Sequence, residues 1–162
     1  MIGVTFPTTF DVDRVVASAI TQIIAASTNP LTADRTYYVR TDGSDTNTGL
    51  TNTAAGAFKT LQKAVDAAYD LDCGGYKVTI QVAAGTYTAG VKIIGRLRNA
   101  YDTNRRPFQI IGDIVTPANV AIVIPSANAI ELFDAYLYLD GVSISTTSGG
   151  YGTLVRVHST LE

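Results

Sequence analysis

The feature that most constrains the fold is a series of short apolar runs with no helical pattern between them. Beyond Gly90 the runs have four or five residues and are rich in β-branched side chains, as strands are. They cover residues 91–94, 108–111, 120–124, 129–132, 136–139, 142–145 and 154–157. A βαβ sheet needs a helix between successive strands, so that class is excluded. A β-sandwich remains an alternative, but hairpin dipeptides flank few of the runs, and parallel coiling explains the pattern better.

The spacing of the runs predicts a solenoid. Aligning Ile80, Ile110, Ile130 and Leu154 gives steps of 30, 20 and 24 residues, with residues 99–106 as an excursion in the longest step. Steps of this size correspond to one turn of a solenoid. We therefore predict a mainly β chain whose strands pair in parallel from one turn to the next.

One helix is predicted before the strands begin, over residues of about 60–71. Its apolar positions recur at i, i+3, i+4 and i+7 and form one stripe. These positions are Leu61, Ala64, Val65 and Ala68. Thr60 is suited to cap the first turn, and Gly74-Gly75 to end the helix. The alternating segment Val78–Val82 follows as a strand, so we expect the helix to cover the first strands.

Four segments in the first half of the chain carry a resemblance to a known family. They are Tyr37–Asp45, Asn47–Gly49, Phe58–Ala64 and Val78–Tyr87. Together they resemble the opening of pectate-lyase-like right-handed parallel β-helix proteins, especially the tailspikes and tail fibres of bacteriophages. In that family the helix plugs the N-terminal end of the solenoid. The shaft is usually a homotrimer that binds or degrades bacterial surface polysaccharide.

The resemblance implies a structural and receptor-binding part of a phage or prophage tail appendage. Such a protein would be assembled in the host cytoplasm, lie in the virion tail and engage bacterial surface polysaccharide. The alternative is the N-terminal part of a polysaccharide lyase or glycoside hydrolase, a depolymerase whose catalytic coils would follow residue 162. Binders and enzymes share this opening, so the fold does not decide between them. A secreted adhesin is disfavoured because no signal-peptide pattern opens the sequence.

Two domains are predicted on the same basis. Residues 1–35 would form an extended segment and an amphipathic helix that attach to virion tail or baseplate proteins. Residues 36–162 would begin the β-helix shaft. No segment after 154–157 has the pattern of a cover for the last coil, so we expect the chain to be the front part of a longer protein.

The segment 12–26 has the spacing of a coiled-coil seam. Its seam positions are Val12, Val16, Ala19 and Ile23. Two heptads are too short to hold a coiled coil alone, so two interpretations stay open: the neck of a homotrimer, and a helix packed on its own domain. The polar residues 27–34 include Pro30 and predict a linker.

Candidate carbohydrate-binding residues lie on the later runs. Tyr136 and Tyr138 share one strand face and could stack on sugar rings, although a structural tyrosine ladder is the alternative. Glu131, Asp134 and Asp140 are the acids that lie near one another on predicted coils. A glycosidase uses two carboxyl groups about 5 to 9.5 Å apart, whereas turn capping is the ordinary role of such residues. The family's catalytic residues cannot be matched here, so the catalytic residues are unknown and we expect this part of the chain not to be catalytic.

Composition argues against several other classes of function. A net charge of −2 over 162 residues does not suit a nucleic-acid partner. No apolar run reaches the length of a membrane span, so no membrane insertion is expected. Asp42, Asp45 and Asn47 lack the spacing of an EF-hand loop and favour Asx turns over a metal site. We expect no cofactor and no metal.

Overall fold

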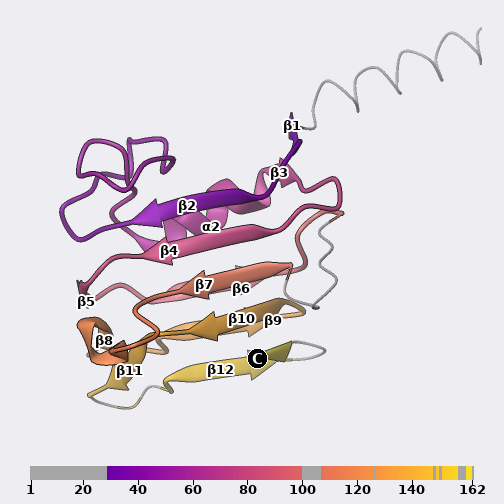
Figure 1. Ribbon diagram of the computed structural model, residues 1–162. Helices are drawn as coiled ribbons and strands as arrows, with labels where there is room; N and C mark the ends of the chain where they lie inside the picture. Colours follow the sequence, from indigo (N-terminus) through magenta and orange to yellow (C-terminus); the bar gives the residue numbers. More distant parts are fainter. Residues whose placement is uncertain are drawn as a thin grey trace, which may run out of the picture.

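The computed structural model describes residues 29–99, 107–125, 127–147, 149, 151–156 and 160–161. Short strands run side by side in several sheets, with helix α2 (Leu61–Tyr69) behind two of them (Figure 1). The strands are β1 (Asn29–Pro30), β2 (Arg35–Val39), β3 (Leu71–Asp72), β4 (Val78–Val82), β5 (Gly85–Tyr87), β6 (Val91–Ile94), β7 (Phe108–Ile111), β8 (Val120–Ile124), β9 (Ile130–Phe133), β10 (Tyr136–Asp140), β11 (Ser143–Thr146), β12 (Thr153–Arg156) and β13 (Thr160–Leu161). A short 3-10 helix, η1 (Pro117–Asn119), precedes β8. Within the described residues, no helix has the length and apolar content that crossing a bilayer would require.

The predicted strands are confirmed to within one residue at either end. Alternation of apolar and polar side chains explains their position, since it buries one side of each strand. In β4, for example, Val78, Ile80 and Val82 are buried while Thr79 and Gln81 are half-buried on the other side. The prediction of a mainly β chain with parallel strands is also confirmed.

The strands other than β1 and β3 form three sheets in which all the pairs are parallel. The strand orders are β2-β4-β7-β10-β13, β5-β8-β11 and β6-β9-β12. We call the first of these the five-stranded sheet. Strands that follow one another along the chain belong to different sheets: β4, β5 and β6 enter the three sheets in turn, and β7 to β9 and β10 to β12 repeat that order.

The alignment predicted from the sequence is correct in its first step and wrong afterwards. Ile80 pairs with Ile110, but the next residue in that row is Leu139 rather than Ile130. Ile130 and Leu154 lie on neighbouring strands of a different sheet, β9 and β12. β7 and β9 share the same alternation, which fixes the buried face of a strand but not the sheet that it joins.

Helix α2 packs its apolar stripe on the interior side of β2 and β4 and also contacts β6. Its buried residues are the predicted ones, Leu61, Ala64, Val65 and Ala68. The Thr60 hydroxyl accepts a hydrogen bond from the Lys63 N–H at 3.2 Å, which confirms the predicted N-cap. The helix ends at Tyr69, earlier than predicted, because residues 71 and 72 form strand β3.

Strand β3 pairs with β1, which lies inside the segment predicted as a linker. Asn29 pairs with Leu71 and Pro30 with Asp72. Leu31 is only 6% exposed, so the end of the expected linker is part of the packed body. A proline fits this short pair because it removes only one donor from the ladder. The seam residues Val12, Val16, Ala19 and Ile23 lie outside the described residues.

A side chain of α2 covers part of the edge of β6. The Gln62 Oε1 accepts a hydrogen bond from the Lys92 backbone N–H at 2.8 Å, and the Gln62 Nε2 donates to the Lys92 carbonyl at 3.1 Å. The carboxamide therefore makes the two bonds that a neighbouring strand would make. Close by, the Tyr69 hydroxyl donates to the Gly95 carbonyl at 2.9 Å.

The polar loop 41–57 is held against the start of α2 by Asp45. One carboxylate oxygen accepts hydrogen bonds from the backbone N–H groups of Lys59 and Thr60, both at 2.9 Å, and the other accepts from the Thr60 hydroxyl at 2.8 Å. Asn47 donates to two loop carbonyls at 3.0 and 2.8 Å. The side chains of Asp45 and Asn47 thus bond to groups seven or more residues away rather than in the predicted Asx turns.

We expect Gln62→Ala to lower the free energy of unfolding by about 1 kcal/mol, because two backbone groups of Lys92 lose their partner. Urea denaturation measures this change, and amide hydrogen exchange at Lys92 should become faster. Lys63→Ala, on the exposed side of the same helix turn, is the matched control and should leave that exchange rate unchanged. An unaltered rate at Lys92 in Gln62→Ala would contradict the assignment.

Asp45 should give the fold a dependence on acid. Its partial burial acts to raise its pKa, but the hydrogen bonds from Thr60 and Lys59 outweigh this and hold the pKa below the usual carboxyl value. The resulting stabilisation is complete above the ordinary carboxyl pKa of about 4 and is lost as pH falls through the lower pKa of the folded state. We expect the urea midpoint of the wild type to fall more steeply than that of Asp45→Asn between about pH 5 and pH 2. Parallel pH slopes of the wild type and Asp45→Asn would refute this role. Asp66→Asn, which keeps Asp45, is the control variant.

Candidate functional site

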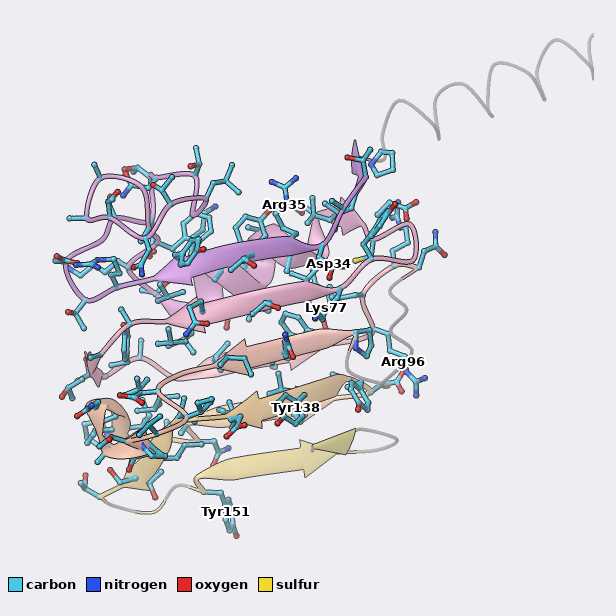
Figure 2. All side chains as sticks on the ribbon, in the orientation of Figure 1. Asp34, Arg35, Lys77, Arg96, Tyr138 and Tyr151 are labelled. Atoms are coloured by element: carbon cyan, nitrogen blue, oxygen red, sulfur yellow. The ribbon has the colours of Figure 1, made fainter. Side chains whose placement is uncertain are left out.

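The solvent side of the five-stranded sheet carries a continuous polar and aromatic surface. Its side chains are those that point away from α2 and the core, by the alternation of each strand. We call this surface the outer face and define it by Thr36, Tyr38, Thr79, Gln81, Gln109, Ile111, Tyr136, Tyr138 and Asp140. Asp140 is exposed and the other eight are half-buried. Figure 2 shows Tyr138 on β10 within this sheet.

Parallel pairing brings these side chains into rows that cross the strands. One row consists of Thr36, Thr79, Gln109 and Tyr138, and the next consists of Tyr38, Gln81, Ile111 and Asp140. Neighbouring strands lie about 4.8 Å apart, so the side chains of a row recur at that interval, and all except Ile111 are polar or aromatic. The outer face is therefore a regular array assembled from segments far apart in the sequence.

Hydrogen bonds hold several of these side chains in place. The Gln109 Nε2 donates to the Thr79 hydroxyl at 2.7 Å. The Gln81 Nε2 donates to the carbonyls of Ile111 and Gly112 at 3.1 and 3.2 Å. Because the amide nitrogens of both glutamines are engaged in this way, the orientation of their carboxamides is fixed before any ligand binds.

Tyr136 and Tyr138 lie where the sequence predicts them. They share one side of β10, while Leu137 between them is fully buried. The Tyr138 hydroxyl donates to an Asp140 carboxylate oxygen at 3.0 Å. This hydrogen bond links the row that contains Tyr138 to the row that contains Asp140. Three of the five candidate residues are thus close together on one strand.

The other two candidates lie elsewhere. Glu131 belongs to β9, in a different sheet, where it accepts a hydrogen bond from the Asn128 side chain at 2.7 Å. Asp134 is exposed in the turn between β9 and β10, with a positive φ of 49° that Asp tolerates better than most residues. The structure therefore does not bring the three acids to one sheet face.

Tyr38, Thr79, Gln81 and Gln109 are not among the site residues predicted from the sequence. The alternation of β2, β4 and β7 already marked them as solvent-facing. What the sequence lacked was the strand order, which places them beside Tyr138 and Asp140. Pattern alone cannot supply that order, since every strand has the same period.

Two ion pairs lie at the borders of the outer face. The Arg40 guanidinium donates to both carboxylate oxygens of Asp42, at 2.8 and 3.0 Å. This hydrogen bond holds the pKa of Asp42 below its usual range, so Asp42 is ionised and offsets the Arg40 charge. The Lys77 Nζ lies 3.9 Å from an Asp34 carboxylate oxygen.

The outer face combines hydroxyls, carboxamides and phenol rings, with one carboxylate. Hydroxyls and amides both donate and accept hydrogen bonds, and rings give apolar stacking area, so the set suits a polyhydroxylated ligand. Over the described part of the chain, no three His, Cys, Asp or Glu side chains lie close enough to hold a metal ion. Comparisons with family models, with curated proteins and with solved structures find no match for this chain.

Proposed function

We propose that this chain is the opening part of a right-handed parallel β-helix whose outer face binds bacterial surface polysaccharide, as the receptor-binding shaft of a phage or prophage tail appendage. The observation that carries the proposal is the outer face itself: aligned rows of phenol, hydroxyl and carboxamide groups on parallel strands. Such rows match the repetition of a polysaccharide, in which similar hydroxyl groups recur along the chain.

The repeated order of the sheets supports the β-helix. Successive strands enter three sheets in the same sequence three times, and every strand pair is parallel. Helix α2 packs on the first strands, and Gln62 satisfies part of the β6 edge, as a plug at the end of a solenoid would. Attachment to a virion tail through residues 1–35 is proposed from the resemblance of residues 37–87 to phage tailspikes and tail fibres.

Hydrogen-bonding capacity supports the carbohydrate ligand. Gln81 and Gln109 use their amide nitrogens within the protein, so their carbonyl oxygens are oriented by those bonds. Tyr138 supplies a ring whose hydroxyl is itself anchored on Asp140. A rigid surface binds more tightly because less side-chain entropy is lost on association.

We expect Tyr138→Ala to weaken polysaccharide binding by about ten-fold, because stacking area of the ring is lost. Binding is measured by isothermal titration calorimetry with purified O-antigen and capsular polysaccharides. Tyr151→Ala removes a tyrosine that is 66% exposed and lies outside the five-stranded sheet, so it should bind like the wild type. Failure of the wild type to bind any polysaccharide of a broad panel would overturn the proposal.

We also propose a homotrimer assembled through the seam Val12, Val16, Ala19 and Ile23. Residues with β-branched side chains at a seam position are compatible with three strands. A charge in the seam should dissociate the trimer, because an unpaired carboxylate is costly to bury.

Light scattering at micromolar concentration tests the assembly. The wild type should have three times the 17.1 kDa mass of the chain, and Ile23→Glu should not. Thr21→Glu adds the same charge on the opposite side of a helical wheel and should remain trimeric. A monomeric wild type rules the trimer out, and a trimeric Ile23→Glu moves the contact away from the seam.

A further inference from the structure

The charges around the outer face are unevenly balanced. Its border cations are already paired with carboxylates: Arg40 in a two-bond contact with Asp42, and Lys77 with Asp34 at 3.9 Å. The Lys77 backbone N–H also donates to Asp34, at 3.0 Å. Pairing offsets the positive charge of both side chains, so neither presents a free cation to a ligand on the outer face.

Asp140 is the charged residue within the outer face. Unlike Arg40 and Lys77, it is not part of a described ion pair. It is exposed at the end of β10, and its side chain accepts a hydrogen bond from the Tyr138 hydroxyl, which is neutral. Within the described residues, the ion pairs are those of Arg40 and Lys77, so Asp140 has no cationic partner. No described cation therefore offsets its negative charge.

Two further cations of the described residues, Arg35 and Arg96, lie off this surface. In Figure 2 the Arg35 guanidinium lies beyond β2, on the side away from β4, whereas β10 is separated from β2 by β4 and β7. Arg96 follows β6, which belongs to a different sheet. Among the described residues, a ligand lying along the row from Tyr38 to Asp140 thus meets a negative charge at Asp140 that no described ion pair offsets.

We infer that the outer face selects neutral glycans over acidic ones, and that Asp140 is the residue that sets this selectivity. The inference rests on the proposed function, because it concerns the same surface. A uronate, sialate or phosphate group near Asp140 meets a like charge, whereas the hydroxyl of a neutral sugar can donate a hydrogen bond to the carboxylate. Discrimination by repulsion is a common route to specificity in binding surfaces.

The test uses one polysaccharide backbone in two charge states. A capsular polysaccharide that contains uronic acid is compared with the same polymer after its carboxyl groups have been reduced to alcohols. In buffer of low salt, the wild type should bind the reduced polymer about three- to ten-fold more tightly, because the repulsion between two charges a few ångströms apart in water is of that size. The ratio should shrink as salt is added, since salt screens exposed charges.

Asp140→Asn removes the charge while keeping the shape and the acceptor for Tyr138. It should bind the acidic polymer more tightly than the wild type does and reduce the preference to less than about two-fold. Asp66→Asn is the matched control: it makes the same change in net charge on α2, which packs against the opposite side of β2 and β4 (Figure 1). It should keep the wild-type preference. Circular dichroism of each variant verifies that the fold is retained.

The outcomes separate this inference from the function on which it rests. Tight binding of the reduced polymer by the wild type, together with restored binding of the acidic polymer by Asp140→Asn, supports both glycan binding and the charge selectivity. Equal or tighter binding of the acidic polymer by the wild type overturns the charge selectivity and leaves glycan binding intact. An unchanged preference in Asp140→Asn removes Asp140 from its role. No binding of either form, across polymers of several compositions, overturns the proposed function and the inference with it.

Discussion

The pairing of backbone groups between parallel strands is the constraint on which the rest of the structure depends. Each strand of four or five residues must find partners for its N–H and C=O groups on both sides or leave them to water. Strands adjacent in sequence do not supply them, because β4, β5 and β6 lie in different sheets. The partners come from the next set of strands, about 30 residues along the five-stranded sheet, as the pairing of Ile80 with Ile110 shows. At the start of the array, the Gln62 carboxamide makes two hydrogen bonds with the Lys92 backbone, in place of a neighbouring strand.

Pairing in register also determines how the turns pack. Gly112 follows β7 and Gly141 follows β10, so the two turns lie next to each other. A Cβ at Gly112 would overlap the Gly141 carbonyl oxygen, and Gly141 has a φ of 68°, which glycine adopts without strain. These two glycines allow β7 and β10 to end at the same level. The alignment of Gln109 with Tyr138 and of Ile111 with Asp140 depends on that close approach.

The same alternation that builds the core creates the outer face. Ile80, Ile110 and Leu137 are fully buried, and the residues beside them in each strand face solvent. The core therefore fixes the positions of the outward side chains, and hydrogen bonds such as that from Gln109 to Thr79 fix their orientations. A surface built in this way is rigid and extended, with little charge of its own. The proposed binding of a long, hydroxyl-rich polymer rests on these properties.

The sequence by itself determined the local structure of this protein. The period of α2, its Thr60 cap, the limits of the predicted strands and the outward position of Tyr136 and Tyr138 all follow from neighbouring residues, because they depend on side-chain alternation and turn chemistry. Only the tertiary structure decided which strands pair, that Glu131 lies on a different sheet from Asp140, and that residues 29–31 join the packed body. Those outcomes depend on contacts between distant segments whose patterns are alike, and the choice among such partners is made by packing of the whole chain.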